Sequence, residues 1–126
     1  AASDVYKRQA ISFYFKNKYK DDIRTVGVQP APNEVIPGIR RVETGMKWYH
    51  WMHFDEVVDV KQTEAIEASV TVARKEGLLI GLSAGAIVHA FNKIAKDQRV
   101  YALILPDTGY KYAEQFEKYF TSIKTR

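Results

Sequence analysis

The sequence predicts an α/β fold in which helices flank a parallel sheet. Two observations support this prediction. Predicted strands alternate with predicted helices along the chain, and residues 100–105, VYALIL, are apolar at almost every position. A strand buried on both faces has this composition, and such strands are typical of parallel sheets. With 126 residues, 46% of them apolar, the chain suits one domain or a piece of a larger one.

The composition indicates which classes of ligand and partner the chain can bind. The net charge of +4 suits anionic small ligands, but lysine and arginine form no long stripe, so we expect no nucleic-acid partner. The absence of cysteine excludes disulfides and thiolate metal sites. No run approaches about 18 consecutive apolar residues, and no secretory signal is visible. We therefore expect no membrane span and a cytoplasmic location.

The first predicted elements surround a proline-rich loop. Ala10–Tyr19 is predicted to be a helix with an apolar side and lysines near its end, where cations suit the helix dipole. Ile23–Val28 is predicted to be a short strand that ends before Pro30, because proline donates nothing to a ladder. The nine residues before this helix, AASDVYKRQ, resemble a translated assembly artefact of environmental sequence fragments. We expect residues 1–9 to be an artefact or a disordered lead, and the chain to be truncated upstream.

The segment Gly38–Phe54, GIRRVETGMKWYHWMHF, has no clear periodicity. A packed irregular loop, a ligand lid and an interface are all compatible with it. His50 and His53 have a spacing that a helix could bring together, but no glutamate follows the first histidine and no third ligand is evident. We therefore expect no metal site.

The remaining predicted elements are the strand Glu56–Val60, the amphipathic helix Gln62–Glu76, the strand Val100–Leu105 and the helix Tyr110–Ser122. Gly77 suits the position after a helix end.

The stretch Gly77–Ala90, GLLIGLSAGAIVHA, is predicted to pass from an extended run into a helix that begins at Ser83 and ends near Lys96. Ser83 is a good N-cap candidate because its oxygen can accept from a free amide of the first turn. Gly85 is a poor helix former, which suggests that something packs closely against it. Ligands of open α/β sheets bind beyond the C-terminal ends of the strands, and the Ser83 turn and the turn Pro106–Gly109 could share that rim.

Five segments together resemble the cysteine synthase family, which comprises pyridoxal-phosphate enzymes of fold type II related to cystathionine β-synthase. They occur in the family's order and spacing: Val26–Ala31, Asp55–Val58, Glu64–Ile66, Glu76–Ala86 and Ile104–Gly109. The resemblance covers about residues 10–120. It implies that residues 10–126 are the C-terminal portion of the large, cofactor-binding domain, with a partial three-layer parallel sheet and flanking helices.

The resemblance also implies a reaction. An activated serine, O-acetylserine or O-phosphoserine, would undergo β-replacement with sulfide on pyridoxal 5'-phosphate to give L-cysteine. The full-length parent would bind a small-molecule amino-acid substrate and form a homodimer. Two alternatives stay open: a cystathionine β-synthase or threonine dehydratase-like lyase on the same fold, and a non-catalytic binding or scaffold protein.

Site residues follow from the same resemblance. Ser83 would bond the pyridine nitrogen, and Asp107, Thr108 and Gly109 would lie beside the ring. The simpler alternatives are a helix cap and a plain turn. Gly38 and Arg40 would bind the substrate, and Arg40 would bind its phosphate, because a guanidinium can grip phosphate through two hydrogen bonds. The simpler alternative is an exposed surface arginine.

Several family features are expected upstream of this chain: the Schiff-base lysine, the glycine-rich loop for the cofactor phosphate, and the loop for the substrate carboxylate. We therefore expect the chain alone to be inactive. Lys61 and Gln62 also replace the family's usual Ser-Asp helix start.

Overall fold

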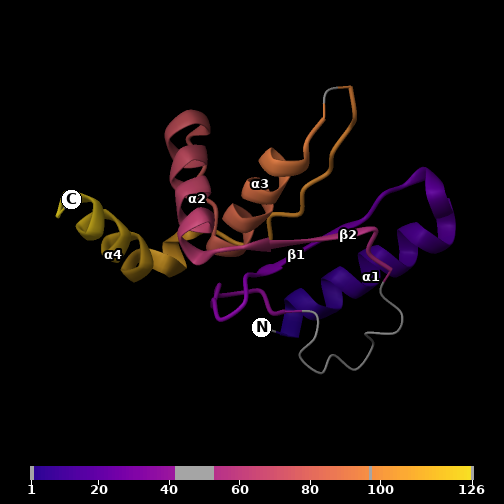
Figure 1. Cartoon of the computed structure of the whole chain (residues 1–126), viewed down its shortest axis with the longest axis horizontal. Helices are drawn as coiled ribbons and strands as arrows, with labels where there is room; N and C mark the ends of the chain where they lie inside the picture. The colour runs from indigo at the N-terminus through magenta and orange to yellow at the C-terminus, as the bar shows by residue number, and fades with distance from the viewer. Residues whose placement is uncertain (1, 42–52, 97, 126) are drawn as a thin grey trace.

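The computed structural model of the chain describes residues 2–41, 53–96 and 98–125 (Figure 1). Its main elements are α1 (Ala2–Tyr19), β1 (Val26–Pro30), β2 (Glu56–Val60), α2 (Gln62–Glu76), α3 (Leu82–Ile94) and α4 (Ala113–Lys124). Two short 3-10 helices, η1 (Lys20–Asp22) and η3 (Gly109–Tyr112), precede β1 and α4. The bounds of β2 and α2 are those predicted from the sequence.

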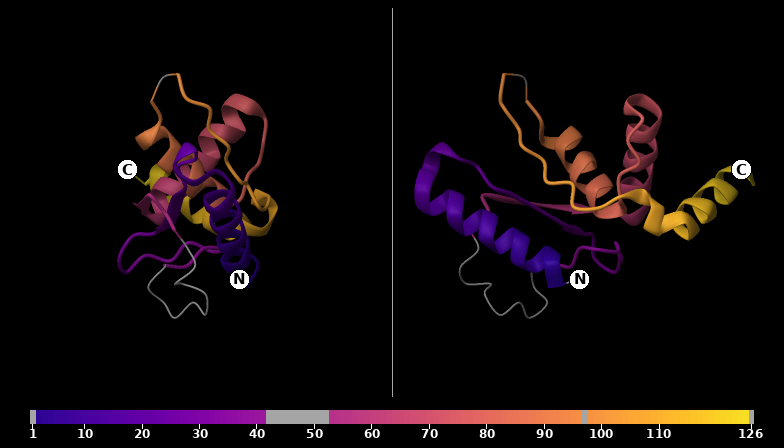
Figure 2. Two further views of the ribbon diagram at one scale, coloured as in Figure 1. Left: turned by 90° about the vertical axis from the view of Figure 1, so that its right-hand side faces the viewer. Right: turned by 180° about the vertical axis from the view of Figure 1, so that it is seen from behind.

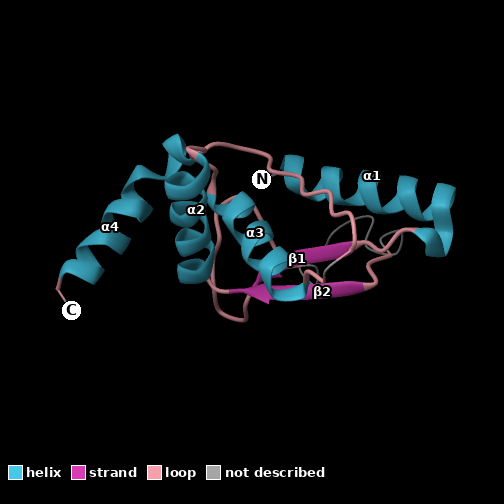
Figure 3. Cartoon of the chain, turned by 90° about the horizontal axis from the view of Figure 1, so that it is seen from above, coloured by secondary structure: helices cyan, strands magenta, loops and turns pink. Residues whose placement is uncertain are grey.

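The two strands form a parallel sheet, in which Val26 pairs with Glu56 and Pro30 pairs with Val60. Helix α3 lies over one face of this sheet, α2 packs against α3 beyond the end of β2, and α1 runs along the other side of the sheet (Figure 1, Figure 2). Seen from above, α4 extends away from the strands toward the C-terminus (Figure 3). The prediction of a parallel sheet with flanking helices is confirmed, and the sheet is small.

The core lies where α2 and α3 meet each other and the sheet. Its buried members include Val58, Val60, Ile66, Leu82 and Ala86. Gly85 of α3 faces α2 so closely that a Cβ atom there would lie 2.1 Å from the carbonyl oxygen of Ala65 and 2.2 Å from Ser69 Oγ. The prediction that something packs tightly against Gly85 is confirmed, and the small residue sets how near the two helices can come.

The prediction of a strand at Val100–Leu105 is wrong. Within the described residues this segment forms no strand, and Val100, Ile104 and Leu105 are exposed. A strand needs a neighbour for its backbone hydrogen bonds, and in the described residues this segment pairs with neither β1 nor β2. An apolar composition suits a buried strand, but it does not supply the partner.

Helix ends also differ from the predictions. α1 begins at Ala2 rather than Ala10, so residues 2–9 are helical rather than a disordered lead, while their origin stays a prediction. α3 begins at Leu82, and Gly81 rather than Ser83 is its N-cap, because the Gly81 carbonyl already accepts from the Gly85 amide at 2.9 Å. α3 ends at Ile94, before the predicted Lys96.

The ends of α2 agree better with expectation. Gly77 closes the helix with a φ of 69°, in the left-handed region that favours glycine. At the start, where Lys61 and Gln62 depart from the family pattern, the Glu64 carboxylate accepts from the Lys61 amide at 2.8 Å. A lysine side chain has no acceptor, so Glu64 performs the capping that the usual serine or aspartate would share.

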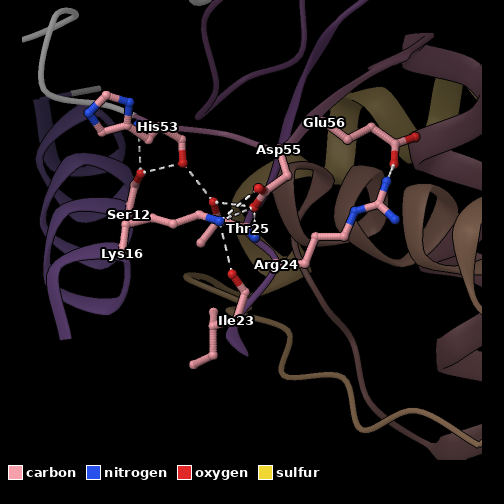
Figure 4. A network of polar contacts seen from close by, with 8 residues as sticks. All are labelled: Ser12, Lys16, Ile23, Arg24, Thr25, His53, Asp55 and Glu56. Carbon is pink, nitrogen blue, oxygen red and sulfur yellow. Dashed lines mark hydrogen bonds and ion pairs between the residues drawn. The ribbon is translucent and has the colours of Figure 1, made fainter. Parts of the chain in front are cut away.

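A polar network ties α1 to the starts of both strands (Figure 4). Lys16 donates to Asp55 Oδ1 at 2.7 Å and to the Ile23 carbonyl at 2.9 Å. Asp55 Oδ2 accepts from the Thr25 amide at 2.6 Å, and Ser12 Oγ donates to the carbonyl of His53 at 3.0 Å. His53 thus joins the fold through its backbone, while its predicted companion His50 lies outside the described residues.

In the described part of the chain, no helix combines the length and the apolar character needed to cross a bilayer.

Candidate functional site

The candidate site lies where the entry to α3 meets the turn that follows residues 98–106. The Gly81 amide donates to the Asp107 carbonyl at 3.1 Å, and the Gly109 amide donates to the Leu79 carbonyl at 3.0 Å. Thr108 and Ile80 form an antiparallel bridge between these bonds. The two segments are therefore joined along their backbones, which holds the Asp107 turn against the N-terminal end of α3.

This junction brings the side chains of Ser83 and Asp107 together. Ser83 Oγ lies 3.4 Å from Asp107 Oδ1, at hydrogen-bonding distance, and Ser83 is only 1% exposed. Gly81 allows the approach, because a Cβ atom there would lie 1.9 Å from the same carboxylate oxygen. A carboxylate at a helix N-terminus also has a favourable interaction with the helix dipole.

Gly38 completes the site from the loop after β1. Its φ of +94° lies in a region that side-chain-bearing residues rarely adopt, and a Cβ atom there would lie 3.4 Å from Ser83 Oγ. Among the predicted site residues, the structure therefore brings together Gly38, Ser83 and Asp107, with Gly109 fixing the turn.

The other two predicted site residues, Thr108 and Arg40, lie at the surface. Thr108 takes part through its backbone bridge, and its side chain is exposed. Arg40 is exposed, and its carbonyl accepts from Arg8 Nη2 at 3.1 Å. The neighbouring Arg41 differs, because its Nη1 donates to the Pro30 carbonyl at 2.6 Å and lies 3.2 Å from Asp59 Oδ1. Of this arginine pair, Arg41 has a structural role.

Tyr112 is a member of the site that the sequence reasoning missed. Its hydroxyl donates to Asp107 Oδ2 at 2.5 Å. Burial raises the pKa of Tyr112, and the hydrogen bond to Asp107 and the charge of that carboxylate raise it further, to about 12. The sequence places this residue on the apolar side of the last helix with Phe116 and Phe120. Its position three residues after the Asp107–Gly109 turn was the signal that could have suggested a second role.

The donor set suits an uncharged heterocyclic nitrogen better than a metal ion. Ser83 supplies one neutral hydroxyl beside small residues, and the approaches at Gly38 and Gly81 exclude side chains from the same spot. Across the described ranges, no group of three or more histidine, aspartate or glutamate residues is arranged to hold a metal ion. The pyridine nitrogen of the predicted cofactor would need one such hydroxyl, and because Ser83 is buried, the site would have to open to admit the ring.

Comparison with known proteins identifies the family. The family of pyridoxal-phosphate dependent enzymes matches residues 9–106. This chain belongs to that family. Cysteine synthase B of Pseudomonas aeruginosa is 35% identical over 106 residues, which cover 81% of this chain and 35% of that protein. Cysteine synthase B of Escherichia coli is 32% identical, over 78% of this chain and 34% of its own length.

Solved structures share the fold of this chain. The O-acetylserine dependent cystathionine beta-synthase of Helicobacter pylori superposes with a TM-score of 0.67 at 22% identity, over 85% of this chain and 38% of that one. The chain thus spans about a third of the length of the curated relatives it matches. The resemblance to fold type II enzymes is confirmed for fold, family and cofactor dependence.

Proposed function

We propose that the chain is part of a pyridoxal-phosphate dependent cysteine synthase, whose full-length form replaces the leaving group of an activated serine with sulfide. The observation that carries this proposal is the meeting of Ser83 Oγ and Asp107 at 3.4 Å, beside the N-terminal end of a helix that opens with small residues. The identities to two cysteine synthases support the same reaction class.

Pyridoxal phosphate, when bound, supplies the electron sink for loss of the proton and leaving group from the amino-acid substrate. The part of this chain is to hold and orient the ring. Ser83 would bond the ring nitrogen in place of its contact with Asp107, and its neutral hydroxyl would not keep that nitrogen protonated as a carboxylate would. A weaker electron sink favours elimination over transamination. Asp107, Thr108 and Gly109 would form the turn beside the ring, and Gly38 keeps the facing loop free of a side chain.

Arg40 is the residue proposed to select the activated serine. It follows Gly38 by two positions and is exposed, whereas Arg41 is held by Pro30 and Asp59. An exposed guanidinium can bind a phosphate through two parallel hydrogen bonds, which an acetyl group cannot match. We infer that the full-length protein prefers O-phosphoserine to O-acetylserine.

The donor preference is tested on the full-length protein by steady-state kinetics with each donor and sulfide. We expect Arg40→Ala to raise KM for O-phosphoserine at least about tenfold more than KM for O-acetylserine, the loss of a charge-assisted bond. Lys111→Ala, which removes another exposed cation, is the control and should leave the ratio unchanged. An equal effect of Arg40→Ala on both donors would refute the assignment.

The present chain is proposed to be inactive alone, because none of its lysines occupies the family's Schiff-base motif. A cytoplasmic homodimer is proposed for the full-length parent. Mixing the purified chain with pyridoxal 5'-phosphate tests the first point by absorption spectroscopy. A cofactor band that survives dialysis would contradict the proposed absence of the anchoring lysine.

A further inference from the structure

We propose that Tyr112 is a latch that shields the Ser83 hydroxyl, and that a ligand reaches Ser83 only when the bond between Tyr112 and Asp107 opens. The ligand's identity as the cofactor ring rests on the proposed function. The latch itself is a property of the described residues and can be tested without any ligand.

The first step of the argument is the burial of Ser83. The Ser83 residue is 1% exposed although it lies in the first turn of α3, next to a surface turn. Its hydroxyl has Asp107 on one side and Gly38 on another. A hydroxyl that bonds a ligand has to become reachable, so at least one of its neighbours has to move.

Tyr112 is the neighbour whose side chain spans the site. Its Cε2 atom lies 3.0 Å from the position that a Cβ atom would take at Gly81, and its hydroxyl lies 3.8 Å from the corresponding position at Gly38. The phenol thus reaches from one glycine that flanks Ser83 to the other. Because Gly81 and Gly38 have no side chains, the ring of Tyr112 can lie between them.

The bond that holds Tyr112 in place is the shorter of the two to Asp107. Tyr112 donates to Oδ2 at 2.5 Å, whereas Ser83 lies 3.4 Å from Oδ1. The raised pKa of Tyr112 keeps the phenol protonated, and therefore a donor, throughout the physiological pH range. The latch accordingly opens by movement and not by ionisation.

The element that carries Tyr112 is suited to such movement. Gly109 is the buried residue of η3, and no residue of α4 is buried. Elements with little buried apolar surface open at low free-energy cost compared with the core. Tyr112 also packs, partly buried, against the core, so its release breaks the bond to Asp107 and this packing but leaves α2, α3 and the sheet folded.

The test uses the fact that the chain contains no cysteine. Ser83→Cys introduces a single thiol, whose reaction with a chromogenic disulfide reagent reports how often position 83 opens to solvent. We expect slow reaction in Ser83→Cys, and reaction about tenfold faster when Tyr112→Phe is added, because a hydrogen bond to a charged acceptor is lost. Tyr110→Phe is the matched control, since Tyr110 is 81% exposed, and should leave the rate unchanged.

Equal rates in the Tyr112→Phe and Tyr110→Phe backgrounds would overturn the latch, as would a thiol that reacts in Ser83→Cys alone as fast as in the unfolded chain. If Ser83→Cys disturbs folding, amide hydrogen exchange at residues 82–85 replaces it, with Tyr112→Phe and Tyr110→Phe in the otherwise natural chain. Faster exchange in Tyr112→Phe alone supports the latch, and equal exchange overturns it. Failure of the full-length protein to bind pyridoxal phosphate would instead refute the proposed function and leave these rates as they are.

Discussion

Replacing Gly85 by alanine should destabilise the fold, although alanine is the better helix former. The new Cβ atom would lie 2.1 Å from the Ala65 carbonyl oxygen, a backbone atom that cannot turn aside. It would also lie 2.2 Å from Ser69 Oγ, which donates to the carbonyls of Ala65 and Gly81 at 3.0 and 3.2 Å. α2 and α3 would have to separate, and the two bonds of Ser69 would be strained or lost.

The expected magnitude follows from three contributions. Overpacking of a dense interface costs about 1–3 kcal/mol, and a backbone clash belongs at the upper end of that range. Loss of a buried hydrogen bond adds about 1 kcal/mol. The gain in helix propensity from glycine to alanine offsets roughly 1 kcal/mol. The free energy of unfolding should therefore fall by about 3 kcal/mol. This sum holds when α2 and α3 do not rearrange enough to relieve the overpacking.

Denaturant unfolding at constant temperature measures this difference, with the midpoint and slope both recorded. Asn92→Ala is the matched control, because it raises helix propensity on the exposed side of the same helix without adding a contact to α2. We expect Asn92→Ala to change stability by at most about 0.5 kcal/mol. A Gly85→Ala variant as stable as the natural chain would refute the close packing of α2 and α3 described here.

The remaining predictions concern the ionisation of Tyr112 and Asp55. Asp107→Asn should lower the pKa of Tyr112 from about 12 toward 10.0, measured by ultraviolet titration of the phenol, and an unchanged pKa would contradict their bond. Because the folded pKa of Tyr112 is raised, its contribution to stability should be complete below pH 10.0 and disappear as the pH rises through about 12. The Lys16 hydrogen bond lowers the pKa of Asp55, so Asp55→Asn should destabilise the fold at neutral pH and have less effect in acid, below the folded pKa. Unfolding midpoints at the two pH values test this, and the same loss at both would exclude an ionic contribution of Asp55.

Local sequence was sufficient for elements whose signals lie within them. The strand Glu56–Val60 and the helix Gln62–Glu76 were predicted with their observed bounds, since alternation, helical periodicity and the glycine after the helix are all local signals. The strand predicted for Val100–Leu105 failed because a ladder depends on a partner elsewhere in the chain. The N-cap of α3 was misplaced by two residues, because both Gly81 and Ser83 suit that position.

In the candidate site, too, some features follow from the local sequence and others depend on the tertiary structure. The amino-acid sequence by itself determined the family, through the order and spacing of five segments, and it marked Ser83, Gly38 and the Asp107 turn as candidates. Only the tertiary structure decided that Tyr112 closes the group, and that Arg41 rather than Arg40 is held by the fold. The reason is physical. Ser83 and Asp107 are 24 residues apart, and the distance between their side chains depends on how the turn packs against α3, which local periodicity does not encode.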